Sequence, residues 1–376
     1  MTNIKRVALT IAFVALAIIV GASFKGSNIL DRSIILGLGI DGSSDGGITL
    51  TAEVVSPGNS SDQQGGAFSK TVTVDAPAIG EAIQNIAEYT GKEASLGQCV
   101  VLIFGQNFYE NVDFSDVIEY LINHHSLKES SVICCCEGSA KDFLNNGDAL
   151  SQSVSLSVAS LMLDQAKKVA VYSNNLLKYA RSQRELHCTG FLNKIKFVPS
   201  ENKDAQSPDK TQGYFSYREY AVFRENSYVC DIDEQEALGM ALLTEDVVGE
   251  TFIAQMDGLT RTIQVNNKSI DQKTTDDGGL EITIKLSVRL GRTDSEEVSG
   301  ALSAKKEKEI DPKILDDVKA QARALAELYL AKQAAYNFDL IKFHETYRQK
   351  EGANEQLAQK PTADFPVKLT IEIKEG

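Results

Sequence analysis

The sequence predicts a multidomain protein of the α/β and α+β classes. We expect an N-terminal hairpin with a βαβα domain, a central helical and β region, and a C-terminal antiparallel sheet packed on a long helix. The 376 residues suffice for two to three domains of roughly 150 residues each. Strand and helix patterns alternate up to residue 146, as in α/β domains. After residue 233, alternating strands precede the longest amphipathic helix.

The first 24 residues have the layout of a signal anchor or a signal peptide. Lys5 and Arg6 precede an apolar run from Val7 to Ala22. An apolar helix of about 17–25 residues spans a bilayer, and its flanking cations stay cytoplasmic, so the remaining chain is expected outside. Cleavage after Ala22 is the alternative. The predicted membrane-anchor residues are Lys5, Arg6, Val7, Ile11, Phe13, Leu16, Ile19 and Val20.

Residues 31–146 are predicted to form an N-terminal α/β domain. Its first two strands flank a turn rich in Gly and Ser and make a hairpin. Pro77 is expected at the first position of a helix that Gly91 ends. The predicted strands are Ser33–Asp41, Ile48–Val55, Phe68–Val74, Cys99–Gly105 and Ser131–Cys136, and the later helices are Val112–Ile122 and one that begins at Ala140–Leu144.

Residues 147–232 are predicted to form a middle domain. It begins with helices and ends with a hairpin turned at Glu225 and Asn226, and the polar segment 199–213 reads as a loop or linker. The predicted elements are helices at about Val154–Lys168 and Val171–Arg184, and strands at Thr189–Val198, Tyr214–Phe223 and Tyr228–Ile232.

Residues 233–376 are predicted to form a C-terminal α+β domain. Asp311 and Pro312 are expected as the N-cap and first residue of a helix that runs to about Tyr336. The other elements are a short helix at Asp233–Leu243, three strands with turns at Asp257-Gly258, Asn266-Asn267 and Asp276–Gly279, and a last strand at Phe365–Ile373.

The charge and the cysteines exclude some classes of function. The chain has 52 acidic and 38 basic residues, and residues 25–376 alone have a net charge of −16, which argues against a nucleic-acid partner. None of the six cysteines has CxxC spacing, so neither a zinc site nor a redox motif is predicted. Cys134, Cys135 and Cys136 read as a buried strand, with a disulfide or a reactive thiol as alternatives.

Two motifs near the first turn have simpler structural interpretations. Gly37–Gly42 matches GxGxxG, but a strand follows it where a dinucleotide site needs a helix, so a hairpin is expected. Asp41–Gly46 resembles the first half of a calcium loop. The twelfth position, which should hold a glutamate, is Ala52, so we expect solvated turn acids.

The histidines do not form a recognisable catalytic or metal motif. His124 and His125 follow a helix, and adjacent helical residues do not share a face, so a shared metal is not expected. His344-Glu345 lacks the second His of HExxH because position 348 is Arg348, and His187-Cys188 is an isolated pair. Gly42–Gly46 matches GxSxG, but it lies in the turn between the first two predicted strands, whereas a nucleophile elbow needs a turn from a strand into a helix, so a serine hydrolase of that type is not expected. We therefore predict no enzyme and no cofactor.

Several segments, in this order, resemble one known family. They are Asp31–Asp41 with Ile48–Val55, Leu96–Gly105, Glu137–Asp142, Ala221–Phe223 with Glu234, Glu236 and Gly239, and Phe338–Phe343. Together they resemble the Ger(x)C family, the C subunits of spore nutrient-germinant receptors. Family members usually carry a lipid-bearing Cys just after the apolar segment, whereas the first Cys here is Cys99. The family's tryptophans are absent and its Arg-Asp pair is replaced by His124-His125-Ser126, so the chain resembles a divergent member anchored by an uncleaved helix.

The resemblance implies a non-enzymatic, extracytoplasmic scaffold tethered to the inner spore membrane. Its partners would be polytopic membrane receptor subunits, with no nucleic acid involved. The alternative is a free-standing exported small-molecule-binding protein or hydrolase, which would need a pocket with convergent ionisable groups. A largest pocket without clustered His, Asp, Glu or Cys would favour the scaffold.

Overall fold

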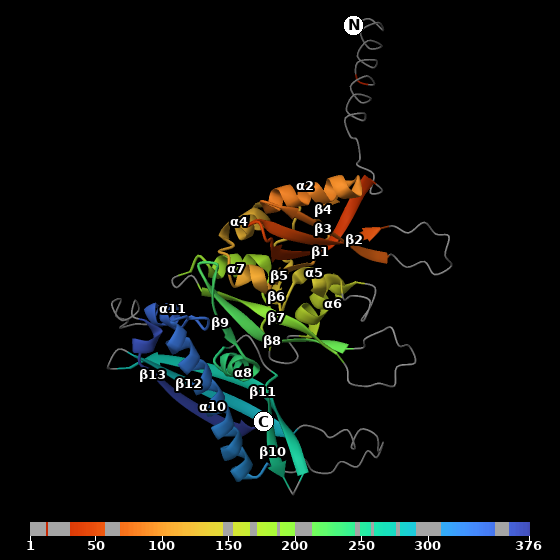
Figure 1. Ribbon diagram of the computed structural model, residues 1–376. Helices are drawn as coiled ribbons and strands as arrows, with labels where there is room; N and C mark the ends of the chain where they lie inside the picture. Colours follow the sequence, from red (N-terminus) through yellow and green to blue (C-terminus); the bar gives the residue numbers. More distant parts are fainter. Residues whose placement is uncertain are drawn as a thin grey trace, which may run out of the picture.

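The computed structural model describes Phe13 and residues 31–56, 68–145, 153–165, 171–185, 189–199, 213–244, 249–256, 259–275, 279–290, 310–349 and 361–376. These residues form two sheets with helices, one below the other in Figure 1. The predicted fold class is confirmed. The signal-anchor segment 1–24 lies outside the described residues except for Phe13, which is helical.

The first sheet combines the strands of the predicted N-terminal and middle regions. Its nine strands follow the order β3-β2-β1-β5-β6-β7-β8-β9, and β4 pairs with β1. The four central strands β1, β5, β6 and β7 are parallel. The strands are β1 (Arg32–Gly42), β2 (Ile48–Ser56), β3 (Phe68–Ala76), β4 (Glu93–Ser95), β5 (Val101–Gly105), β6 (Val132–Cys136), β7 (Thr189–Pro199), β8 (Gly213–Arg224) and β9 (Ser227–Ile232). The domain boundaries at 146 and 232 stay predictions.

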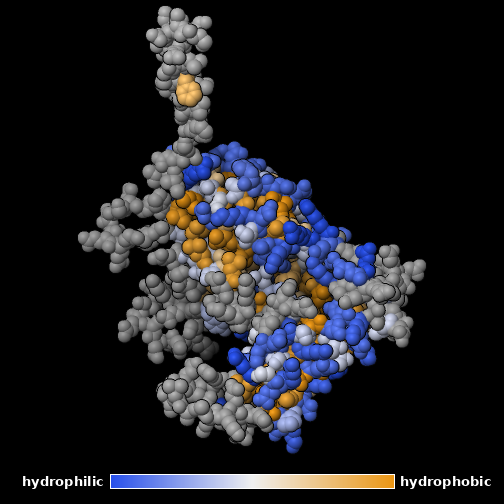
Figure 2. Space-filling view, turned by 180° about the vertical axis from the view of Figure 1, so that it is seen from behind, coloured by the Kyte–Doolittle hydropathy of each residue, from blue (hydrophilic) through white to orange (hydrophobic). Residues whose placement is uncertain are grey.

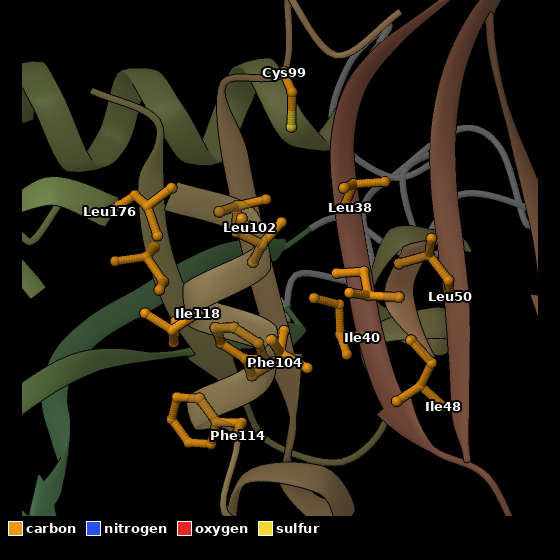
Figure 3. Packing of buried hydrophobic residues seen from close by; sticks show 14 of the residues in the cluster. Leu38, Ile40, Ile48, Leu50, Cys99, Leu102, Phe104, Phe114, Ile118 and Leu176 are labelled. Atoms are coloured by element: carbon orange, nitrogen blue, oxygen red, sulfur yellow. The ribbon is translucent and has the colours of Figure 1, made fainter. Parts of the chain in front are cut away.

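Helices cover both faces of this sheet, which explains the unbroken apolar runs of its central strands. On β5, Leu102 and Phe104 join a core with α2, α4 and α7, while Val101 and Ile103 join a core with α5 and α6. Figure 3 shows the first of these cores between β1, β5 and α4. The helices are α2 (Ile79–Thr90), α3 (Gln106–Tyr109), α4 (Ser115–Asn123), α5 (Ala140–Asn145), α6 (Val154–Ser160) with the π-turn η3 (Leu161–Gln165), and α7 (Leu176–Ser182).

The second sheet contains four strands, in the order β10-β11-β12-β13, with one long helix against it. Its last strand corrects the predicted all-antiparallel sheet: β13 pairs parallel with β12, because the chain returns through a helical crossover. The elements are β10 (Thr251–Met256), β11 (Leu259–Thr274), β12 (Leu280–Leu290), β13 (Val367–Glu375), α8 (Glu234–Leu242), α10 (Pro312–Tyr336), α11 (Phe343–Arg348) and the 3-10 turn η5 (Thr362–Asp364).

Some predicted boundaries are wrong for local reasons. Pro77 precedes the N-cap Ala78, so it lies outside α2. The first helix of the middle region begins at Val154 as predicted, where the Ser153 side chain caps it. The second begins five residues later than predicted, because the Asn175 side chain caps the start of α7 at Leu176. The predicted hairpin turn at Glu225 and Asn226 is confirmed, and both residues have the positive φ that such turns require.

The two sheets share one hydrophobic core. Val222 of β8 and Ile232 of β9, which belong to the first sheet, cluster with Ile284 of β12 and Val318 of α10. Helix α8 lies at this junction and packs mainly on α10. The contact between the two parts therefore has the character of a protein interior.

Candidate functional site

The carboxyl ends of the parallel strands are where an α/β sheet ordinarily binds a ligand. Here a carboxylate of the chain itself takes that place. Asp41 of β1 is 4% exposed, and its two oxygens accept hydrogen bonds from the backbone N–H groups of Ala140 and Lys141, each at 2.9 Å. The Ser139 hydroxyl donates a third at 3.2 Å. The carboxylate thus supplies, at the start of α5, the negative charge that a bound anion would bring elsewhere.

The adjacent gap between β5 and β6 is closed in a similar way. The Gln106 N–H donates to the Gly138 carbonyl at 2.7 Å, and the Gly138 N–H donates to Gln106 Oε1 at 3.2 Å. Gln106 Nε2 donates to Glu110 at 2.8 Å. The polar groups at these strand ends are therefore paired with one another.

The glycines of the GxGxxG match serve helix packing. A Cβ atom on Gly37 would lie 2.1 Å from the Ser155 hydroxyl oxygen, and one on Gly39 would lie 3.0 Å from the side chain of Leu144. These two glycines let α6 and α5 approach β1 closely. The hairpin interpretation of this motif is confirmed, since β1 and β2 pair antiparallel through the turn.

All the buried carboxylates of the described residues accept a backbone N–H group. Asp41 does so as described above. The other four hydrogen bonds, each named by its carboxylate and then by the residue whose backbone N–H donates, are Glu53 from Ser155 at 2.8 Å, Glu236 from Asp233 at 2.9 Å, Glu250 from Gly249 at 3.1 Å, and Asp339 from His344 at 3.0 Å. Four of them lie at the starts of α5, α6, α8 and α11. A carboxylate there stabilises the helix by capping it and by opposing its dipole. These acids therefore hold short helices in place.

The segments that resemble the family contain residues that hold helices in place. Asp41 and Ser139 lie in two of these segments, and Glu236 and Asp339 in two more. Gly239 of α8 packs directly on α10, because a Cβ atom there would lie 2.0 Å from the Leu325 carbonyl oxygen. Sequence reasoning found these residues as a pattern, but it missed the partners of Asp41 and Gly239, which lie far away in the chain, whereas Glu236 and Asp339 bond to residues close by.

One hollow on the surface does contain ionisable groups. It measures about 460 Å³ and is lined by Asp116, Glu119, Tyr120, Asn123, His124 and His125. The expectation that the two histidines point apart is wrong: their rings stack with centroids 5.1 Å apart, because His124 follows α4 in an extended conformation. Partial burial, and then the neighbouring His125, lower the pKa of His124, and its Nδ1 lies 3.1 Å from the Ser126 hydroxyl.

Neither this hollow nor the first turn gathers a set of metal ligands. The smaller hollow, of about 340 Å³, adjoins the turn and is lined by Ser43, Asp45, Gly46, Gly47, Asp75, Ala76 and Pro77. Asp45 is exposed, whereas Asp41 faces the interior, so the two acids of the calcium-like sequence diverge. Within the described part of the chain, no group of three or more His, Cys, Asp and Glu side chains is placed to hold a metal ion.

The thiols are buried and unlinked where the structure describes them. Cys134, Cys135 and Cys136 form the fully buried strand β6, as predicted, and Cys99 and Cys230 are also buried and free. Burial raises the pKa of Cys99 to about 12 and that of Cys230 to about 11. Raised pKa values make these thiols poor nucleophiles. His187 and Cys188 lie outside the described residues.

An apolar surface on α6 and η3 is the best candidate for contact with a partner. Leu156 and Leu163 are 50% and 49% exposed, while Val158 and Met162 of the same segment are buried against the sheet. No charged residue occurs between Asp148 and Asp164. Figure 2 shows that apolar residues also gather on the rear of the N-terminal part of the molecule.

The predicted anchor residues Lys5, Arg6, Val7, Ile11, Leu16, Ile19 and Val20 lie outside the described residues, and Phe13 is helical and 74% exposed. Within the part of the chain that the structure does describe, no helix has the length and apolar character to cross a membrane.

These features define a two-sheet α/β and α+β protein whose buried acids stabilise its architecture. A family model described as the spore germination protein N-terminal domain matches residues 26–196, and one described as spore germination B3/GerAC like, C-terminal, matches residues 218–376. The chain belongs to the Ger(x)C family of spore germinant receptor subunits.

A solved structure shares this fold. The chain is similar to the crystal structure of the GerBC protein with a TM-score of 0.52 and 14% sequence identity, and the match covers 90% of this chain and 96% of that one. None of the curated proteins matches the chain.

Proposed function

We propose that this protein is an extracytoplasmic, membrane-tethered subunit of a spore nutrient-germinant receptor, and that it acts as a scaffold without catalysing a reaction. Its membership of the Ger(x)C family supports the receptor role. The observation that carries the non-catalytic role is the use of every buried carboxylate in the described residues to accept a backbone N–H group. A carboxylate engaged in this way is committed to holding the fold.

The tether in this proposal is the apolar segment behind Lys5 and Arg6. A body with a net charge of −16 over residues 25–376 is repelled by an anionic lipid surface, so an apolar helix is needed to hold it there. The cationic pair orients the segment so that the two sheets lie outside the cytoplasm. In a spore this places the protein on the outer face of the inner membrane.

The partners in this proposal are polytopic membrane receptor subunits. The α6–η3 surface, which carries no charge from Val154 to Leu163 and leaves Leu156 and Leu163 half-exposed, supports a contact with an apolar partner surface. Purification of a tagged full-length chain from spore membranes in mild detergent should recover polytopic subunits. The variant Leu156→Asp/Leu163→Asp should recover several-fold less of them, and the exposed variant Leu328→Asp, on α10, serves as the control.

Removal of residues Met1–Ser23 tests the tether. We expect the shortened chain to stay in the supernatant after membrane fractionation and to unfold at the same temperature as the full-length protein. Recovery of the shortened, folded chain in the membrane pellet would contradict the tether.

The larger of the two hollows described above gathers His, Asp and Glu side chains, so the pocket test does not favour the scaffold and supports a second candidate function at His124 and His125. Ionisable groups converge there, so an exported small-molecule-binding protein or hydrolase would have its site at this place. His124→Ala and His125→Ala would abolish that activity, whereas the scaffold predicts that both variants still recover the receptor subunits.

A further inference from the structure

The N-terminal segment enters the fold next to the end of α2. Arg32, the first residue of β1, is in register with Glu93 of β4, and its Nε lies 3.4 Å from the Glu93 carboxylate. Tyr89 and Lys92 flank Gly91, whose positive φ of 65° ends α2 and turns the chain toward β4. Figure 1 shows α2 and the start of β1 at the end of the molecule farthest from the second sheet.

The tether restricts how far this end can move from the membrane. Eight residue steps separate Phe24, the last residue of the predicted signal-anchor segment, from Arg32. A fully extended chain of that length spans at most about 30 Å. An anchored chain therefore keeps the start of β1, with the neighbouring end of α2, within reach of the bilayer.

Tyr89 has the exposure and the chemistry of an interfacial residue. It is 73% exposed, more than any other aromatic side chain that the structure describes beyond residue 30. Tyrosine combines an apolar ring with a polar hydroxyl and is enriched where membranes meet water. The residues that the structure describes leave most of this ring uncovered.

The charges around Tyr89 are balanced, unlike those of the whole chain. Arg32, Lys70 and Lys92 lie at this end together with Asp31, Glu88 and Glu93. Lys70 is placed there by its register with Val54 of β2, which itself pairs with Ile35 of β1. A lipid surface with negative headgroups repels this end less than it repels a body of net charge −16.

We propose that the end of α2, with Arg32, Tyr89 and Lys92, rests on the headgroups of an anionic lipid bilayer. This inference rests on the proposed tether and adds an orientation to it. The second sheet then points away from the membrane, and α6 lies at the side of the first sheet, between the end of α2 and the second sheet (Figure 1).

The test measures how close two labelled positions lie to lipid headgroups. The full-length chain with Cys188→Ser is placed in vesicles of phosphatidylcholine and phosphatidylglycerol whose headgroups carry a fluorescence quencher. A fluorophore is attached at Tyr89→Cys or, as the matched control, at Tyr214→Cys. Tyr214 is 61% exposed and pairs with Val198, so it lies at the opposite end of the same sheet. The five described native thiols are buried, so they do not compete for the label.

We expect the Tyr89 probe to be quenched several-fold more than the Tyr214 probe. Equal quenching of the two probes on vesicle-bound protein would overturn the orientation while leaving the tether intact. Failure of the full-length chain to bind vesicles at all would overturn the tether and the orientation together. Quenching at Tyr89 that appears only when polytopic receptor subunits are present would overturn the proposal that the lipid contact itself sets the orientation, because the protein partner would then set it. The melting temperature of each labelled variant verifies that it is folded.

Discussion

At the scale of single residues, Lys268 is the most unusual side chain of the second sheet. It lies on β11, and its ammonium group is fully buried, donating to Glu250 Oε1 at 2.7 Å and to the Ala241 carbonyl oxygen of α8. The Asn266-Asn267 pair, where a turn is predicted, instead adds one extra residue to β11 between Val265 and Asn267. This bulge shifts the alternation, so that Lys268 faces the core in phase with Val265.

Loss of Lys268 should cost more than loss of an exposed lysine. Lys268→Met leaves Glu250 buried without its counter-charge, so we expect the free energy of unfolding to fall by about 3–5 kcal/mol. Lys268→Met combined with Glu250→Gln should recover part of this loss in thermal or denaturant unfolding. Lys273→Met, which removes an exposed ion pair with Asp271, should change it by less than about 1 kcal/mol. Equal losses for the two lysine variants would contradict a buried ion pair.

The buried thiols predict sensitivity to alkaline pH. Burial raises the pKa of Cys99 to about 12 and raises the pKa values of Cys134 and Cys136 as well. An unfolded thiol ionises near pH 8.5, so above that pH the unfolded state loses protons that the folded state keeps. The contribution of each protonated thiol to the free energy of unfolding is therefore fully present below about pH 8.5. Above that pH, this contribution should fall by about 1.4 kcal/mol per pH unit until the pH reaches the pKa of the thiol in the folded protein.

Melting temperatures between pH 7 and pH 10 provide the measurement. The wild-type protein should lose stability steeply above about pH 8.5. Cys99→Ala should lower the stability at pH 7. Above pH 8.5, the variant should lose less stability per pH unit than the wild-type protein, because one thiol fewer is titrated. An identical slope in the variant would mean that Cys99 is not protected from ionisation.

At the scale of elements, short helices are held by carboxylates from other parts of the chain. The capping box of α8 is local, since Asp233 and Glu236 bond to each other's backbone N–H groups, and such a pattern can be recognised in a sequence. Asp41 and Glu53 cap α5 and α6 from strands about a hundred residues away. No sequence spacing reveals such pairs, so the burial of Glu53 at the start of α6 cannot be predicted from its strand.

The contact between α8 and α10 depends on Gly239. A Cβ atom at this position would lie 2.0 Å from the Leu325 carbonyl oxygen and 3.0 Å from the Tyr329 side chain. Gly239→Ala must therefore push the helices apart, and we expect it to lower the free energy of unfolding by about 1–3 kcal/mol. The matched control is Gly97→Ala, whose nearest atom is the Ser126 carbonyl oxygen at 3.8 Å. Thermal unfolding of both variants makes the comparison, and equal stability would refute close packing at Gly239.

At the scale of the whole molecule, most strands and helices are predicted correctly because period-two alternation and helical spacing are local properties. The direction of β13 is not, since it depends on how α10 carries the chain across the second sheet. The joining of β7, β8 and β9 to the first sheet is equally invisible in the sequence, because pairing between β6 and β7 links residues about sixty positions apart. For the candidate site, the sequence predicts that no catalytic or metal-binding motif is assembled. That Asp41 and Gln106 fill the space at the carboxyl ends of the parallel strands can be seen only in the folded structure, because their partners lie at Gly138 and Ala140.

The core shared by the two sheets has a mechanical consequence. Val222 and Ile232 project from the first sheet into the cluster that contains Ile284 and Val318, so packed apolar side chains join the two parts here. Moving one part against the other would expose these side chains to water, so the shared core opposes such a motion. A partner bound to the second sheet is thereby coupled to the first sheet through this core.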